Sequence, residues 1–361
     1  PWRPAGGVFE TWPKHAAELK VLDPCCGSGH FLVAAFDLLT RLRMAEEGLP
    51  LAEAMRAVLA QNLHGLELDA RCAQIAAFNV ALAAWRRVGT PIALPGLNVA
   101  CSGMAPRATK AEWIELAERA AAAGGMPGDR DLFGKDESLL SSQTRFALEA
   151  MYDTFALAPE LGSLIDPAEA SNALVLGRYS DLRPLLTAML RSESDAELRE
   201  RAVAAEGMAK AAELLVGPPG GYTLIITNVP YLGRKSHTDE LKRWIDTHYK
   251  FSKNDLATVF VSRMLRWIGE TGTVAAVTPQ NWLFLTGYKH LRERLLRTQS
   301  WNGVARLGAG AFETIGGHVV NVALITISGA PPEENHALSG IDVSAERSAI
   351  GKATLLRGDR S

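Results

Sequence analysis

An acidic residue and two glycines stand close together in the segment 23–31, which reads DPCCGSGHF. Asp23 ends a short apolar run, and Gly27 and Gly29 precede a helix-like apolar stretch that starts at Phe31. Glycine has no Cβ atom, so its backbone turns tightly and approaches a ligand closely. Free N–H groups at a helix start attract carboxylates and phosphates. The segment lacks the GK[ST] of a Walker A phosphate-binding loop and the complete GxGxxG of a dinucleotide-binding loop. It therefore predicts either an anion-binding turn or an ordinary strand-to-helix turn.

A second acidic residue, Glu67, lies in the sequence GLELD (65–69), near the end of the next strand-like run. In nucleotide-binding folds, an acid at the end of the second strand accepts hydrogen bonds from ribose hydroxyls. Glu67 is therefore a candidate ribose acceptor. The alternative is a solvated acid at a strand end.

An amide and an aromatic ring follow a third apolar run, in TNVPYL (227–232). Asn228 offers a carboxamide acceptor, the Pro230 ring stiffens the turn, and Tyr231 offers a flat face. Open α/β sheets bind their ligands at the carboxyl ends of their strands. The run therefore predicts a second half of the same site, or an ordinary turn rich in Asn and Pro.

These residues need a sheet to position them, and the chain has the pattern of one. Strand-like and helix-like stretches alternate over the first hundred residues, which is typical of a doubly wound parallel sheet. The pattern resumes at 222, and two late strands separated by a glycine-rich turn predict an antiparallel pair at the sheet edge. The predicted strands are 19–23, 63–68, 222–227, 273–278, 303–307 and 319–327, and the predicted helices are 31–42, 71–87, 255–268 and 288–297.

A stretch rich in Ala, Glu, Leu and Arg interrupts this pattern and predicts an all-helical insertion. Its helix-like segments are 110–123, 142–157, 182–190 and 195–216. We therefore predict an α/β, Rossmann-like fold with a mostly parallel sheet. Its parts are the first half of the core at 1–103, the insertion at 104–220, the second half at 221–328 and an exit segment at 329–361.

The composition is that of an ordinary globular protein, with 361 residues, 47% hydrophobic residues and a net charge of -2. It excludes a polycation but not a local basic face. The four cysteines form neither a disulfide framework nor a metal-binding CxxC pair, which favours the reducing cytoplasm. No apolar run reaches the ~20 residues of a membrane span. Pro1 is not a natural first residue, so we expect a fragment.

Taken together, the motifs resemble the S-adenosylmethionine-dependent methyltransferases that act on the exocyclic amine of DNA adenine, whose patterns are DPxxGSGxF and NPPY. The segments 97–103, 272–284 and 310–327 resemble further parts of that family, and the resemblance covers most of the chain outside the insertion. The amino-acid sequence of 23–39 and the long insertion look most like the large methylases of the BREX and DISARM phage-defence systems. The resemblance implies a class I methyltransferase fold.

The resemblance also implies roles for individual residues. S-adenosylmethionine would be bound by Asp23, Cys25, Gly27, Gly29, Phe31, Glu67 and Ser102. The exocyclic amine of a flipped adenine would be held by the Asn228 side chain and the Val229 carbonyl, in a turn completed by Pro230 and Tyr231. Tyr231 would stack on the base, and Phe312 would contact its other face or edge, unless Phe312 is a core residue. The transfer is direct, and it requires neither a covalent intermediate nor a metal.

Two positions depart from the family pattern. Val229 replaces the first proline of NPPY, which predicts less rigid positioning, and Ser102 stands where the family often has an acid, which predicts weaker cofactor binding. These departures leave room for a catalytically weak subunit that binds DNA or cofactor. An RNA or protein-glutamine methyltransferase is a further alternative, since such turns also serve other planar amines and amides.

Basic residues follow the catalytic turn, and they predict either a track for DNA phosphates or a solvated helix face. They begin with Arg234 and Lys235 and continue with Lys242, Arg243, Lys250 and Lys253. His237 and His290 lack the spacing of metal ligands and are expected at the surface. Other subunits of a defence complex are possible partners, and no membrane partner is expected.

Overall fold

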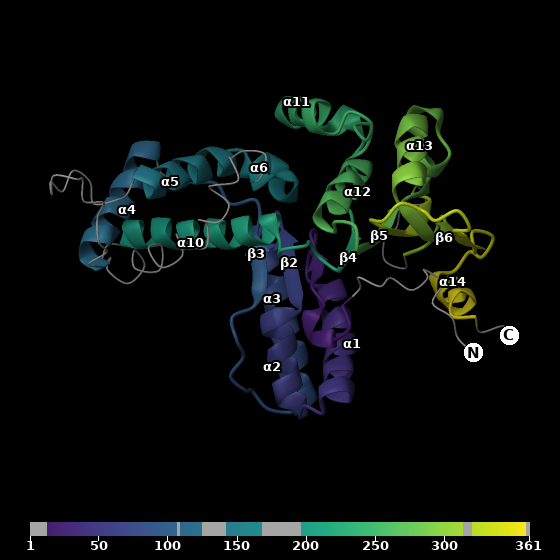
Figure 1. The fold of residues 1–361 in the computed structure, drawn as a ribbon, viewed down its shortest axis with the longest axis horizontal. Helices are drawn as coiled ribbons and strands as arrows, with labels where there is room; N and C mark the ends of the chain where they lie inside the picture. The colour runs from purple at the N-terminus through teal and green to yellow at the C-terminus, as the bar shows by residue number, and fades with distance from the viewer. Residues whose placement is uncertain (1–12, 107–108, 125–141, 168–195, 313–319, 359–361) are drawn as a thin grey trace. The chain divides into compact units, whose positions relative to one another are not determined.

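The computed structural model describes residues 13–106, 109–124, 142–167, 196–312 and 320–358. Eight strands belong to one mixed sheet, and helices accompany it (Figure 1). By compactness the chain divides into two units, which are described in turn. Unit 1 comprises Pro1–Cys25, Ala34–Leu63 and Pro218–Ser361, and unit 2 comprises Cys26–Val33 and His64–Gly217. Among the helices that the structure describes, none is long and apolar enough to cross a membrane.

Unit 1 contains six strands in the order β1-β4-β5-β7-β6-β8. The first three pair in parallel, whereas β7 is antiparallel to both β5 and β6. This confirms a mostly parallel sheet with an antiparallel part. The strand bounds are β1 Val21–Asp23, β4 Leu224–Asn228, β5 Thr273–Pro279, β6 Ser300–Gly308, β7 Val322–Ser328 and β8 Ser339–Asp342.

The antiparallel pair of β6 and β7 lies towards one edge of the sheet, as the sequence predicted, and β8 adds a short parallel strand on the free side of β6. β8 and the helix after it come from the segment 329–361, which was expected only as an exit segment. All four residues of β8 are exposed, so no apolar pattern marks this strand.

The helices of unit 1 flank these strands, and α12 packs against β5. α1 starts in unit 2 and continues into unit 1. The predicted helices 31–42, 255–268 and 288–297 correspond to α1, α12 and α13, while α2 and α11 were not predicted. The bounds are α1 His30–Glu47, α2 Leu51–Gln61, α11 Asp239–His248, α12 Leu256–Trp267, α13 Lys289–Thr298 and α14 Ala349–Leu356, with the 3-10 turns η1 Ala16–Glu18, η3 Arg234–Ser236, η4 Gln280–Leu283 and η5 Thr286–Tyr288.

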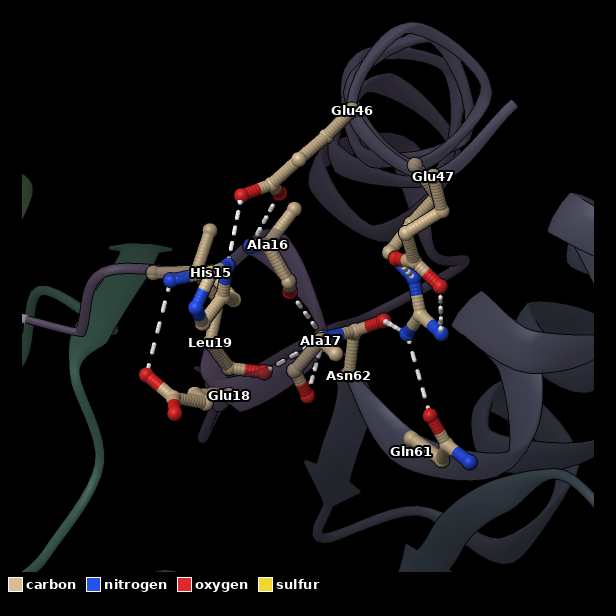
Figure 2. A network of polar contacts seen from close by, with 10 residues as sticks. His15, Ala16, Ala17, Glu18, Leu19, Glu46, Glu47, Gln61 and Asn62 are labelled. Carbon is tan, nitrogen blue, oxygen red and sulfur yellow. Dashed lines mark hydrogen bonds and ion pairs between the residues drawn. The ribbon is translucent and has the colours of Figure 1, made fainter. Parts of the chain in front are cut away.

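A polar network centred on the buried Asn62 holds the segment that leads into β1 (Figure 2). The Asn62 side chain is fully buried and donates to the carbonyl oxygens of Ala16 and Leu19 at 2.9 and 2.7 Å. Its Oδ1 accepts from the buried Arg43 at 3.0 Å, and Arg43 also binds Glu47 on its own helix. Because buried polar groups are stable only when they are hydrogen-bonded, the network fixes the path of the chain into β1.

Unit 2 contains the parallel pair of β2 and β3 and the helix between them. The Asp69 carboxylate caps this helix, since its Oδ1 accepts from the N–H groups of Arg71 and Cys72 at 2.8 and 3.2 Å. Carboxylates at this position satisfy N–H groups that lack a partner in the helix. The bounds are β2 Leu63–Glu67, α3 Ala70–Val88 and β3 Asn98–Cys101.

The described part of the insertion is entirely helical, as the sequence predicted. α4 packs on α5, and α10 packs against β3 (Figure 1), so the insertion belongs to the same compact unit as β2 and β3. The predicted helix 182–190 lies outside the described residues. The bounds are α4 Lys110–Gly124, α5 Ser142–Phe155, α6 Ala158–Leu161, η2 Gly162–Leu164 and α10 Ala196–Val216.

Candidate active site

The turn between β1 and α1 is built around two glycines with positive φ. Gly27 has φ +53° and open space where a Cβ would stand. Gly29 has φ +86°, and a Cβ there would lie 3.0 Å from the Ala76 Cα of α3. Asn79 of α3 also donates to the Ser28 carbonyl at 2.9 Å. The turn is therefore held against α3, and its backbone at Gly27 stays accessible to a ligand.

The Glu67 carboxylate at the end of β2 faces this turn. Its Oε2 accepts from the Gly27 N–H at 2.8 Å, and its Oε1 accepts from the Asp69 N–H at 3.1 Å. An ionised carboxylate has about four acceptor positions. Each oxygen thus keeps a lone pair for a ligand, so two vicinal hydroxyls can be bound while the two backbone bonds fix the carboxylate in place.

Asp23, described within unit 1, is only 1% exposed. Its Oδ1 accepts from the Cys25 N–H at 3.2 Å, so the carboxylate faces the start of the glycine turn. Cys25 is half-buried, and Phe31 is exposed in the first turn of α1. An exposed phenyl ring beside a glycine turn can cover an apolar part of a ligand. These placements leave the roles of the three residues as predictions.

Ser102 is buried at the end of β3, and its hydroxyl pairs with that of Ser163 in the insertion, with 3.1 Å between the Oγ atoms. Next to it, Gly162 approaches so closely that a Cβ would lie 2.8 Å from the Leu68 Cδ1. Leu68 follows Glu67 and is 48% exposed. Residues of the insertion therefore pack directly beside the candidate ribose acceptor. The expected contact between Ser102 and a cofactor stays a prediction.

Asn228, described within unit 1, is the last residue of β4 and is exposed. Its Oδ1 accepts from the Tyr231 hydroxyl at 3.1 Å. Burial raises the pKa of Tyr231, and the Asp255 carboxylate adds to this effect. Tyr231 therefore stays a neutral phenol and can donate this bond at any physiological pH. The bond orients the carboxamide, with Oδ1 towards the Tyr231 hydroxyl.

Val229 continues the pairing of β4 with β5 beyond Asn228. Its N–H donates to the Val277 carbonyl at 3.4 Å, and its side chain is 2% exposed. A proline has no N–H and could not make this bond. The valine thus gains an anchor on β5 in place of the ring that it lacks, while the adjacent Pro230 is exposed.

The loop after Tyr231 is tied to the start of α12. The Leu232 carbonyl accepts from the Leu256 N–H at 2.9 Å, and Gly233 forms an isolated bridge with Asp255. Asp255 also caps α12 by accepting from the Ala257 N–H at 2.9 Å. Burial, together with the Asp255 carboxylate, raises the pKa of Tyr288 to about 12. Asp255 therefore lies near both tyrosines, and sequence reasoning missed it; its position just before an apolar helix was the available signal.

His237 is not at the surface, where the sequence placed it. It is 4% exposed, and its Nε2 lies 2.9 Å from the Leu232 carbonyl oxygen. The histidine was misplaced because its burial comes from the folding back of the loop, not from a local apolar pattern.

The basic residues after the turn are largely compensated. Arg234 and Lys253 both pair with Asp246, at 2.6 and 3.4 Å. Lys242 pairs with Asp239 at 3.3 Å, and Arg243 lies 4.0 Å from Glu240. Among the ion pairs of the described residues, none involves Lys235 or Lys250. Lys235 is thus the cation next to the turn that stays available to a phosphate.

Phe312 is 37% exposed, and it lines a hollow together with α14 residues that include Ile350 and Ala353. Its neighbours 313–319 lie outside the described residues. The expected contact of Phe312 with a base therefore stays a prediction.

Comparisons with known proteins agree with this picture. A family model described as "Eco57I restriction-modification methylase" matches residues 61–312. A second, "MmeI, DNA-methyltransferase domain", matches residues 8–89. The adenine-specific methyltransferase BrxX of Escherichia coli O9:H4 (strain HS) is 29% identical over 84% of this chain and 24% of its own length. The adenine-specific methyltransferase PglX of Lacticaseibacillus casei (strain Zhang) is 29% identical over 87% of this chain and 24% of its own length. The chain thus spans about a quarter of these curated relatives.

Two solved structures share the fold. One is a nuclease-deletion mutant of the Type ISP restriction-modification enzyme LlaGI in complex with a DNA substrate mimic. It has a TM-score of 0.52 and 14% identity, over 94% of this chain and 23% of the other. The ATP-dependent Type ISP enzyme LlaBIII bound to DNA has a TM-score of 0.51 and 13% identity, over 95% of this chain and 19% of the other.

Proposed function

Since the chain belongs to the Eco57I restriction-modification methylase family, we propose that it transfers a methyl group from S-adenosylmethionine to the exocyclic amine of adenine in DNA. The observation that carries this proposal is the exposed Asn228 carboxamide, whose oxygen is oriented by the Tyr231 hydroxyl at 3.1 Å. The setting would be a restriction-modification or phage-defence system in the cytoplasm, where the DNA substrate is found.

The residues present fit the cofactor. Glu67 keeps two acceptor positions for vicinal ribose hydroxyls while the N–H groups of Gly27 and Asp69 fix it. The glycine turn leaves open space above Gly27 for the methionine part. Leu68 offers exposed apolar surface beside the ribose acceptor for an adenine ring. When bound, S-adenosylmethionine would supply an electrophilic methyl group.

The Asn228 turn would activate the target amine. The amine of adenine is a poor nucleophile because its lone pair is delocalised into the ring. An amide oxygen has two lone pairs, and Tyr231 uses one on Asn228, so one remains for an amine N–H. The Val229 carbonyl would accept the second N–H. Two acceptors outside the ring plane draw the nitrogen towards tetrahedral geometry and free its lone pair. Positioning and electrostatics then lower the barrier.

The base must leave the duplex to reach these acceptors. The Tyr231 ring would stack on the flipped adenine while its hydroxyl stays on Asn228. Lys235, which is exposed and has no ion pair among the described residues, would contact a neighbouring phosphate.

A count of N6-methyladenine tests the proposal. DNA from cells that express the full-length protein is digested and analysed by mass spectrometry, beside Asn228→Ala and the exposed matched control Asn335→Ala. We expect methyladenine with the wild type and the control, and none above background with Asn228→Ala. Equal methylation by Asn228→Ala would refute the assigned role of the carboxamide, and methylation by none of the proteins would refute the proposed activity.

A further inference from the structure

A small cavity with a basic rim lies in unit 1, away from the Asn228 turn. It has a volume of about 230 Å³ and is formed by the end of α11, the segment that follows it, α12 and α13. Its floor includes the buried side chains of Tyr249, Leu291 and Leu295. Lys250, Arg266 and Arg294 line it, and all three are exposed. We call it the α12–α13 cavity.

The charge around this cavity is not balanced. Three cations line it, and among the described residues that line it there is no carboxylate. Within the described chain, neither Lys250 nor Arg294 takes part in an ion pair. Two other cations of the neighbouring helices are paired, Lys242 of α11 with Asp239 and Lys289 of α13 with Glu293. In a chain with a net charge of -2, such a gathering of like charges favours an anion.

One of the three cations is held in place. The Arg266 guanidinium lies 4.7 Å from the centre of the Tyr249 ring and donates to the His248 carbonyl at 3.0 Å. The His248 ring stacks on Trp244 at 4.0 Å. These contacts orient the Arg266 guanidinium at the cavity. The hydroxyls of Ser252 and Ser262, which pair with each other, also line the cavity.

The volume limits what the anion can be. Pockets for drug-sized ligands have volumes of roughly 300–1,000 Å³, so a cavity of about 230 Å³ suits a small group such as a phosphate. Arg and Lys at a cavity rim suit phosphate oxygens, because charge-assisted hydrogen bonds to them are short and strong. A phosphate whose attached chain continues outside the cavity fits this size best.

We infer that the α12–α13 cavity binds a backbone phosphate of the DNA, at a distinct point from the Asn228 turn. This inference rests on the proposed DNA substrate. A contact of this kind carries no sequence information. It fixes where the duplex lies on the protein, and thus which nucleotide reaches the turn. The sequence placed the phosphate contacts on six basic residues between 234 and 253, and of these six only Lys250 lines this cavity.

The salt dependence of DNA binding tests the inference. Affinity of the full-length protein for a duplex of about 30 base pairs is measured by fluorescence anisotropy between 50 and 200 mM salt. Each neutralised phosphate contributes about 0.9 to the slope of log K against log salt. The double variant Lys250→Gln/Arg294→Gln removes this one phosphate contact and should therefore lose about 0.9 units of slope and roughly eightfold in affinity at 0.1 M salt. The control Lys242→Gln/Lys289→Gln removes two paired cations from α11 and α13 and should keep the slope.

The outcomes separate this inference from the proposed function. An unchanged slope in the double variant, with folding verified by its thermal midpoint, overturns the inference even if methylation persists. A second outcome also overturns it. If inorganic phosphate raises the thermal midpoint of the wild type but not of the double variant, while the slope is the same in both, the cavity binds only small anions. A reduced slope without methylation by the wild type supports the cavity and refutes the proposed activity. A reduced slope with methylation restored at saturating DNA supports both.

Discussion

The Tyr231 hydroxyl donates a hydrogen bond to Asn228 Oδ1 across three residues of one turn. The donor is a phenol whose pKa is raised by burial, and the acceptor is the exposed amide at the end of β4. The bond holds the Asn228 carboxamide in one orientation, with its Oδ1 towards the phenol. This orientation suits a reaction that needs a hydrogen-bond acceptor at the end of β4.

Tyr231→Phe should slow methyl transfer and leave cofactor binding unchanged. The loss of one hydrogen bond of about 1 kcal/mol corresponds to a fall in kcat of roughly five- to tenfold. Tyr231→Ala should cost more, because base stacking is also lost, at about 1–3 kcal/mol. Steady-state kinetics with labelled cofactor measure both, beside Tyr152→Phe in the insertion as a control. Wild-type kcat in Tyr231→Phe would show that the hydroxyl does not orient Asn228.

Glu67→Gln should weaken the binding of S-adenosylmethionine. An amide has one acceptor oxygen in place of two, so the variant side chain cannot bind the Gly27 and Asp69 N–H groups and two hydroxyls together. Hydrogen bonds to charged groups contribute about 1.5–3 kcal/mol, which predicts a rise in Kd of roughly 10- to 100-fold. Calorimetry measures it, with the exposed Glu53→Gln of α2 as the matched control. Equal affinities in all three proteins would remove Glu67 from the cofactor site.

Gly29→Ala should destabilise the protein more than Gly27→Ala. Both positions have positive φ, which costs an alanine about 1–2 kcal/mol. Only at Gly29 would the new methyl group meet backbone, at 3.0 Å from the Ala76 Cα. Urea denaturation of the two variants therefore isolates the packing contribution as the difference between them. If Gly27→Ala were the less stable variant, the close approach to α3 would not limit the turn.

Strands and helices can be predicted from the sequence where their apolar pattern is continuous. β4 and β5 are recognisable because buried strands of parallel sheets are almost entirely apolar, and α3 because its apolar residues recur along a well-capped segment. β8 could not be predicted, since its four residues are exposed and its structure comes from pairing with β6. α11 could have been predicted from its capping residue Thr238 and its buried residues Leu241 and Ile245. The sequence analysis considered only the charged residues of this segment.

The candidate site follows the same division. Glu67 and Asn228 were predicted because strand ends are visible in a sequence. The pairing of Ser102 with Ser163 joins residues 61 positions apart, and the anchor that Val229 gains on β5 depends on the register of two strands. Such contacts arise only when the chain is folded. The family membership confirms the resemblance that the motifs suggested.

Asp69 should stabilise the fold at neutral pH and lose this effect in acid. Hydrogen bonds from the Arg71 side chain and from the N–H groups of Arg71 and Cys72 lower its pKa to about 2. A carboxyl with a lowered pKa in the folded state stabilises it above the unfolded value near 4, and the effect disappears as pH falls towards 2. Asp69→Asn keeps a capping side chain. Its thermal midpoint should lie below that of the wild type at pH 6 and approach it at pH 3. A difference that grows towards pH 3 would contradict this.

Asn62→Ala should lower the free energy of unfolding by about 2–4 kcal/mol, because it removes the side-chain donor to the carbonyls of Ala16 and Leu19 and one acceptor of the buried Arg43. Urea denaturation measures the change, and Asn335→Ala at the surface should stay within about 0.5 kcal/mol of the wild type. A loss below about 1 kcal/mol would mean that water replaces the amide in the network of Figure 2.

The close approach of Gly162 to Leu68 has a consequence for how such proteins can diversify. Gly162 has φ +50°, which strains any other residue, and a Cβ there would push aside the half-exposed Leu68 side chain. When related genes recombine, a crossover between positions 68 and 162 that brings a larger residue to 162 would therefore alter the apolar surface beside Glu67.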